Sequence, residues 1–183
     1  MWRFCIPLII VSLVGCASGV SRQADTDISG VRTALSEPVS KENPISLLTL
    51  ELSREAKNKL SDNSSFDEQA LFEKISSELT QSGLYVEQTD NIKLNIMVTD
   101  LRIRSGFSAV MFGFFAGNDF ISGEVSLIGE NNTQLDRFSI EVSYAFGGVV
   151  GGETSFRTEW LYSTFTAELI KELKGKNKEI PKQ

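Results

Sequence analysis

The side chains in this chain best suited to forming a covalent bond are its two cysteines, and the position of the second indicates its chemistry. Cys16 comes just after an apolar segment that begins at Phe4 and is interrupted by Pro7. That segment is shorter than the ~20 residues that a membrane-spanning helix needs. A short charged start, a short apolar segment and a small residue before the cleavage point are typical of a secretory signal peptide. We therefore expect residues 1–15 to be removed, which makes Cys16 the first residue.

The four residues Leu13-Val14-Gly15-Cys16 resemble the lipobox of bacterial lipoproteins. The resemblance implies that Cys16 carries a diacylglyceryl group, and two acyl chains are enough to anchor a protein stably. In such lipoproteins an Asp after the cysteine favours retention in the inner membrane, whereas this chain has Ala17 there. The resemblance thus implies a domain in the periplasm, held at the outer membrane by the acyl chains on Cys16.

The composition excludes several functional classes. The chain contains no histidine, so Ser-His and Cys-His nucleophiles are impossible and the commonest metal ligand is missing. Cys5 lies in the removed segment, which leaves one cysteine and no disulfide. The net charge is −6, and loss of Arg3 makes it more negative. Such a chain is a poor partner for nucleic acid, whose binding depends on Lys and Arg. We expect no catalytic residues, no cofactor and no metal.

Two segments show partial likeness to ligand-binding loops. Residues 25–30 begin like a calcium loop, but position twelve is Ser36 instead of a bidentate acid. Residues 147–152 are glycine-rich and precede a predicted helix, as in a phosphate loop, yet they lack its lysine. A solvated tether and glycine-rich turns are the interpretations we favour.

Hydrophobic periodicity predicts the elements of one domain. Residues 45–52 indicate a strand buried on both faces, and a capping box at 65–68 opens a helix that ends at Gly83. A short strand is expected at 84–88. The strand at 92–103 changes phase near residues 99–100, which indicates a bulge. Residues 121–127 and 138–146 alternate as a hairpin, and a helix follows at 155–174.

This order favours an α+β fold with a mixed or antiparallel sheet of four or five strands and two helices packed on one face. Residues 16–44 are predicted to be the lipidated cysteine and a flexible tether, because they are rich in small polar and acidic residues. Residues 45–174 form a single α/β domain in this prediction, and residues 175–183 form a frayed, lysine-rich tail.

Several sequence motifs resemble an uncharacterised family of bacterial envelope lipoproteins, a domain of unknown function. The motifs are Ser82-Gly83-Leu84-Tyr85-Val86, the run from Leu94 to Arg102, Gly113-Phe114-Phe115-Ala116-Gly117 and the late double glycines. The resemblance covers about residues 45–173 and implies a small periplasmic α/β domain without known catalytic residues. More loosely, the chain is similar to accessory lipoproteins of envelope transport systems.

The chain departs from that family in an unusually apolar central segment, the first of two candidate sites. Residues 107–115 lie between Gly106 and Gly117, and their large apolar side chains are a predicted partner or membrane contact: Val110, Met111, Phe112, Phe114 and Phe115. The alternative is a segment folded into the core or extending a strand. The second candidate is Asp100 with Arg102, which form either a polar site at the bulge or an ordinary surface ion pair.

The sequence therefore favours a non-enzymatic accessory or scaffold lipoprotein that binds another envelope protein. A carrier of an apolar ligand such as a lipid is the alternative, and a carboxylate-based hydrolase is a distant third.

Overall fold

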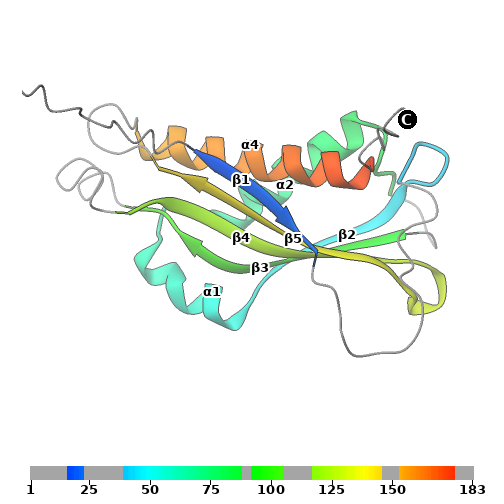
Figure 1. Ribbon diagram of the computed structural model, residues 1–183, viewed down its shortest axis with the longest axis horizontal. Coiled ribbons are helices and arrows are strands. Elements are labelled where there is room, and N and C mark those ends of the chain that lie inside the picture. The colour runs from blue at the N-terminus through cyan, green and yellow to red at the C-terminus, as the bar shows by residue number, and fades with distance from the viewer. Residues whose placement is uncertain (1–15, 23–38, 88–91, 105–116, 146–152, 176–183) are drawn as a thin grey trace, which may run out of the picture.

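The computed structural model describes residues 16–22, 39–87, 92–104, 117–145 and 153–175. In these parts the chain forms one mixed sheet of five strands in the order β1-β5-β4-β3-β2, with helices beside it (Figure 1). The strands are β1 (Ala17–Ser21), β2 (Ile45–Leu52), β3 (Ile92–Arg102), β4 (Asp119–Ile128) and β5 (Gln134–Tyr144). The helices are α1 (Arg54–Lys59), α2 (Glu68–Gln81) and α4 (Thr154–Leu173), with short 3₁₀ turns at Leu60–Asp62 and Glu130–Asn132. The predicted α+β class is confirmed.

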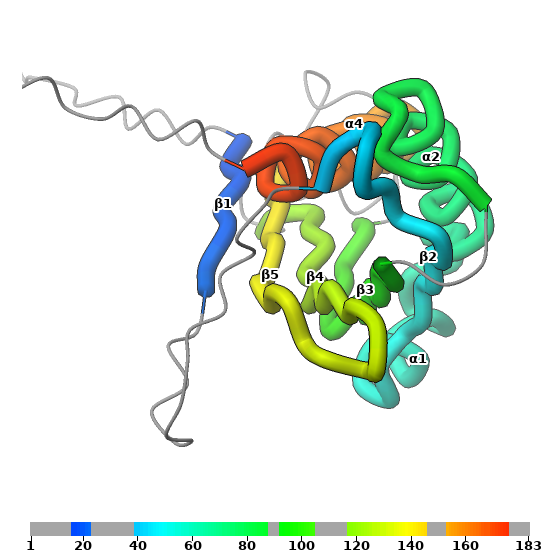
Figure 2. The backbone as a smooth tube through the Cα atoms, turned by 90° about the vertical axis from the view of Figure 1, so that its right-hand side faces the viewer, coloured from blue at the N-terminus to red at the C-terminus, as the bar shows by residue number. Residues whose placement is uncertain are grey.

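The helices α2 and α4 lie side by side on one face of the sheet, as predicted (Figure 2). Every second residue of β4 from Ile121 to Leu127 is buried beneath them, because the side chains of a strand alternate between its faces. Gly123 gives Phe165 room to approach, since a Cβ at Gly123 would lie 3.0 Å from Cζ of that ring. The buried stripe of α4 consists of Leu161, Phe165, Leu169 and Leu173.

The predicted bulge in β3 is present. The pairing of β3 with β4 shifts between Val98 and Asp100, and the buried side chains change from Val98 to Leu101. β2 ends opposite Val98, and α1, which the sequence analysis missed, begins there. Ser53 Oγ donates to the carbonyl of Thr99 at 3.0 Å. The segment around α1 therefore borders the last part of β3, after Val98, which β2 leaves unpaired.

The predicted tether is wrong for its first residues. β1 starts directly after Cys16 and pairs antiparallel with β5, from Ala17 opposite Ser143 to Ser21 opposite Ser139. Its side chains are mostly exposed, so the segment has no hydrophobic alternation to reveal a strand. Backbone pairing and the side chain of Arg22 hold it instead. Val39 is buried as well, and residues 23–38 of the predicted tether lie outside the described residues.

Arg22 fastens the end of β1 to two other elements. Its guanidinium donates to Glu172 of α4 at 2.7 Å and to Asp136 of β5 at 3.1 Å, and it lies 5.1 Å above the ring of Phe138. Near the other end of β1, Ser18 Oγ donates to Glu168 of α4 at 2.9 Å. β1 is thus a fixed edge strand of the domain.

Three further predictions need correction. The cap of α2 is Asp67 instead of Ser65, because the Asp67 carboxylate accepts from the amide of Ala70 at 3.0 Å. β2 is an edge strand rather than one buried on both faces, so Leu47 is 46% exposed. In place of a strand at 84–88 there is a single parallel bridge from Tyr85 to Ile45, and residue 88 lies outside the described residues.

The end of α2 agrees with the prediction. Gly83 follows the helix with a φ of +71°, a conformation that glycine adopts without penalty.

Candidate functional site

Cys16 lies at one corner of the sheet, where several elements begin or end. It is half-buried and packs against the edge of the core. Because Ala17 pairs with Ser143, the antiparallel register brings Cys16 level with Tyr144, the last residue of β5. β4 begins at the same end of the sheet, since Asp119 pairs with Tyr144. The fold therefore starts immediately after the predicted lipid attachment point, with no spacer.

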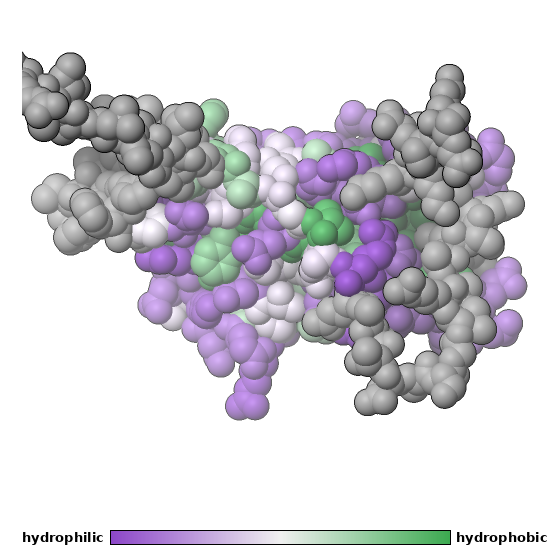
Figure 3. Space-filling model, in the orientation of Figure 1, coloured by the Kyte–Doolittle hydropathy of each residue, from purple (hydrophilic) through white to green (hydrophobic). Residues whose placement is uncertain are grey.

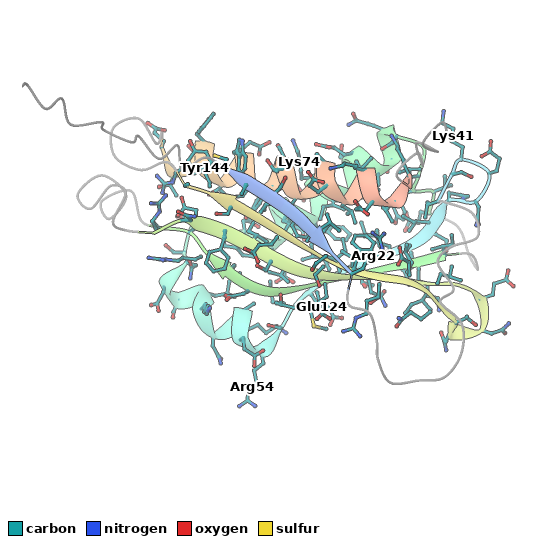
Figure 4. All side chains as sticks on the ribbon, viewed as in Figure 1. Arg22, Lys41, Arg54, Lys74, Glu124 and Tyr144 are labelled. Carbon is teal, nitrogen blue, oxygen red and sulfur yellow. The ribbon has the colours of Figure 1, made fainter. Side chains whose placement is uncertain are left out.

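An aromatic cluster lies beside Cys16. The ring of Tyr144 makes edge contacts with Phe156 and Trp160 of α4, at centroid distances of 6.4 and 5.2 Å. Tyr144 is buried, Trp160 is half-buried and Phe156 is 58% exposed. Burial is the main cause that raises the pKa of the Tyr144 phenol. Figure 4 labels Tyr144 at the end of the sheet where β1 and α4 begin. We call Cys16, Tyr144, Phe156 and Trp160 the anchor corner.

A buried ionic triad lies at the same end of the sheet. Asp119, the first residue of β4, accepts a hydrogen bond from Nε of Arg104 at 2.9 Å and from Nε of Arg157 at 2.7 Å. The backbone amide of Arg104 also donates to Asp119 at 2.7 Å, and Arg157 donates to the carbonyl of Arg104 at 2.7 Å. All three side chains are at most 2% exposed. A buried charge is tolerated only with such partners.

The triad ties together the ends of three elements. Arg104 follows β3, Asp119 opens β4 and Arg157 lies in the first turn of α4. The two apolar or glycine-rich segments of the sequence, 105–116 and 146–152, join the chain next to these residues. The triad thus holds the end of β3, the start of β4 and the start of α4 together.

The sequence analysis missed the triad, although two signals for it were present. Arg157 stands four residues before Leu161 and so falls on the buried stripe of α4. Asp119 falls on the buried parity of β4. A charged residue at a core position requires a partner of opposite charge, and that requirement would have connected them.

The opposite face of the sheet carries a shallow depression of about 410 Å³ beside β1. It is lined mostly by serine, threonine and glycine, with Glu141 as its charged residue. A second open depression of about 520 Å³ lies on the outer side of α2 and α4, next to Lys74 and Lys174. The view in Figure 3 shows largely hydrophilic surface with small apolar patches.

The residues singled out from the sequence fall in different places. Cys16 and Ala17 stand at the start of β1, and Ala17 is exposed. The structure places Asp100 in a surface ion pair with Lys59 of α1 instead of with Arg102, while the guanidinium of Arg102 lies close to Gly117. The five apolar candidates, Val110, Met111, Phe112, Phe114 and Phe115, lie outside the described residues.

Within the described ranges, no three His, Cys, Asp or Glu side chains gather in a way that would hold a metal ion. None of the helices in those ranges has the length and apolar character needed to cross a membrane.

These features define a small α+β domain built on a mixed sheet with two helices over one face. Residues 26–148 match the family described as a domain of unknown function, DUF4410, and the chain belongs to that family. The expectation of an uncharacterised family is confirmed. No curated protein matches the sequence.

The solved structures that are similar to this chain include two of PelC from Paraburkholderia phytofirmans. One is a PelC dodecamer, with a TM-score of 0.47 and 11% identity, covering 88% of this chain and 99% of that chain. The other is a point variant of the dodecamer, with a TM-score of 0.43 and 14% identity, covering 84% and 96%. The values are low, so neither the assembly nor the activity of PelC carries over to this chain.

Proposed function

We propose that this protein is an outer-membrane lipoprotein, anchored through acyl chains on Cys16, whose periplasmic domain is a non-enzymatic accessory or scaffold for another envelope component. The position of Cys16 carries the proposal. The cysteine completes the lipobox-like sequence and stands at the outer corner of the sheet, directly before β1. A lipid on this sulfur is compatible with the core, because Cys16 is only partly buried and packs against the core from outside it.

The open face of the sheet, opposite α2 and α4, supports the proposal that the domain binds another envelope component. The outward side chains of β3, β4 and β5 are mostly polar or charged, with the half-buried Phe120 and Met97, which is 45% exposed, among them. An antiparallel sheet with helices on one face presents the other to solvent or to a partner. We assign partner binding to this face.

Acylation is tested by growing cells with an alkyne analogue of palmitate and measuring its incorporation into the full-length protein. The wild-type protein is expected to be labelled and the Cys16→Ser variant unlabelled. Sorting is tested with Ala17→Asp, which should shift the protein to the inner membrane on a density gradient. Ala17→Ser is the matched control and should stay in the outer membrane, because both substitutions occupy the same exposed position. Equal labelling of wild type and Cys16→Ser would contradict the anchor.

Partner binding is tested by photo-crosslinking in intact cells. Benzoylphenylalanine in place of Met97 is expected to capture one discrete envelope component. The same probe in place of Lys171, an exposed residue of α4 on the helix side, serves as the control and should capture none. Absence of any product from position 97 in a correctly acylated protein would contradict a scaffold role for the open face.

A further inference from the structure

The absence of a spacer after Cys16 determines how the domain meets the membrane. Adjacent Cα atoms are about 3.8 Å apart, and β1 begins at the residue after Cys16. The headgroup layer of a bilayer is about 5–8 Å thick on each side. Acyl chains on Cys16 would therefore hold the corner of the sheet against that layer, whereas a flexible tether would have let the domain stand away from it.

We propose that the anchor corner is a membrane-docking surface, with Phe156 and Trp160 of α4 lying in the headgroup layer of the phospholipid bilayer. The proposal rests on the acylation of Cys16 proposed above. It adds the orientation of the domain and the residues that set it.

The aromatic side chains of the corner suit this environment. Phe156 and Trp160 are four residues apart, so they lie on the same face of α4. Phe156 is 58% exposed, and an exposed phenylalanine gains free energy when an apolar surface covers it. Tryptophan is enriched where hydrocarbon meets water, because its ring is apolar and its N–H is polar. Tyr144 supports both rings from β5.

The rest of α4 has a different surface. Glu159, one residue before Trp160, pairs with Lys74 of α2, and further along α4 Glu168 pairs with Lys171. Glu168 is about 18 Å further along the helix than Phe156, at 1.5 Å per residue. The exposed aromatic surface of α4 is thus confined to the end beside Cys16. This asymmetry places the first turns of α4 against the bilayer and its lysine-bearing C-terminal end toward the periplasm.

The mature chain contains a built-in probe of this orientation. The sequence has two tryptophans, Trp2 and Trp160, and a Trp2→Phe substitution leaves Trp160 as the only one whether or not residues 1–15 are removed. Leu47 provides a probe at the opposite end of the sheet, since it pairs with Lys93 near the start of β3. The length of β3 separates the two ends by about 30 Å, and Leu47 is 46% exposed.

The experiment measures tryptophan fluorescence of the full-length protein reconstituted into phosphatidylcholine vesicles with or without bromine on the acyl chains. Bromine quenches only tryptophans that reach the bilayer. We expect about twofold or greater quenching for the Trp2→Phe protein, because its single indole lies at the interface. The control combines Trp2→Phe, Trp160→Phe and Leu47→Trp, and its fluorescence should be unchanged. Equal quenching of the two proteins, or quenching of the control alone, would overturn the proposal.

A second pair of variants tests the role of Phe156. In the Trp2→Phe background, Phe156→Ser should reduce the quenching of Trp160, because it removes the exposed ring. Val86→Ser is the matched control, since Val86 is 40% exposed and its amide donates to the carbonyl of Ile45 at the far end of the sheet. It should leave the quenching unchanged. Equal effects of the two substitutions would show that Phe156 has no specific part in docking.

The failure of docking and the failure of acylation are distinguishable. Intact-mass measurement of the same samples reports whether Cys16 carries acyl chains. If it carries none, the proposed function fails, and the orientation is then tested by coupling a maleimide phospholipid to Cys16 in a Cys5→Ser variant. If Cys16 is lipidated by either route and Trp160 remains unquenched, the docking surface is wrong while the anchor stands.

Discussion

Arg157 donates a hydrogen bond from Nε to Oδ2 of Asp119 across 2.7 Å, which joins the first turn of α4 to the first residue of β4. Arg104 binds the other carboxylate oxygen at 2.9 Å. Asp119 is fully buried. Its one carboxylate thus holds two guanidinium groups at the end of the sheet that also carries Cys16.

Replacing Asp119 with Asn should destabilise the protein strongly. The substitution keeps the size of the side chain but removes the negative charge that compensates Arg104 and Arg157, and breaking a buried ion pair in this way costs about 3–5 kcal/mol. Urea unfolding followed by far-UV circular dichroism measures the loss. Glu124→Gln is the matched control, because its ion pair with Arg137 is exposed. It should cost less than about 1 kcal/mol, and comparable losses for the two variants would rule out a stabilising role for the triad.

Gly123 is predicted to be intolerant of even a methyl group. An alanine Cβ there would lie 3.0 Å from Cζ of Phe165, which is held in the core by α4. Gly123→Ala should therefore cost about 1–3 kcal/mol through overpacking. Gly19→Ala is the control, because nothing lies within 4 Å of its Cβ position. Thermal unfolding should separate the variants, and an unchanged melting temperature for Gly123→Ala would show that α4 is free to shift.

The parts of the fold that sequence could predict are those governed by burial. Apolar side chains recur at a fixed period in the hairpin of β4 and β5, on both sides of the bulge of β3 and along the stripe of α4. The period is fixed because only every second residue of a strand, or every third to fourth residue of a helix, faces the core. Such a pattern also predicts which face the helices cover.

The parts that sequence analysis missed are those held by backbone or charge. β1 buries little of its side chains and depends on pairing with β5 and on Arg22. The short α1 buries only Ala56. Asp119 and Arg157 stand at the starts of β4 and α4, where a charged residue breaks the apolar pattern of the buried stripe. At the anchor corner, Cys16 was found from its surroundings in the sequence, whereas its proximity to Tyr144 depends on β1 and was not predictable.

The backbone amides of β1 that pair with β5 are predicted to exchange slowly, as expected for a paired strand rather than a tether. Hydrogen exchange of the full-length protein in detergent should show protection within Ala17–Ser21. Arg22→Ala should speed this exchange several-fold, because it removes the contacts with Asp136 and Glu172. Arg137→Ala removes a similar ion pair on the open face of the sheet and should leave β1 protected. Rapid exchange throughout β1 in the unaltered protein would show that these residues are the flexible tether predicted from the sequence. It would also remove the basis for docking at the anchor corner.

Ionisation of the Tyr162 phenol should make the protein less stable in strong alkali. Its hydroxyl accepts from the amide of Asp67 at 2.8 Å and donates to the carbonyl of Asp67 at 3.0 Å, which fixes the start of α2. Burial raises the pKa of Tyr162 to about 12. Because the unfolded phenol ionises near pH 10, the unfolded state releases its proton first as the pH rises. The associated stability is present below pH ~10 and is lost as the pH approaches 12, by up to about 2–3 kcal/mol.

Comparison with Tyr162→Phe isolates this group from the other residues that titrate in alkali. At pH 8 the variant should be less stable than wild type by about 1–3 kcal/mol, since the Asp67 amide and carbonyl lose their partner. Between pH 10 and 12 the Tyr162 phenol ionises in the unfolded wild-type chain but stays protonated in the folded one, which lowers the wild-type free energy of unfolding. The variant lacks this phenol, so the difference between the two free energies of unfolding should narrow. Urea unfolding at pH 8, 10 and 11.5 measures this difference. A gap that stays constant would mean that the Tyr162 phenol ionises at the same pH in the folded and the unfolded chain.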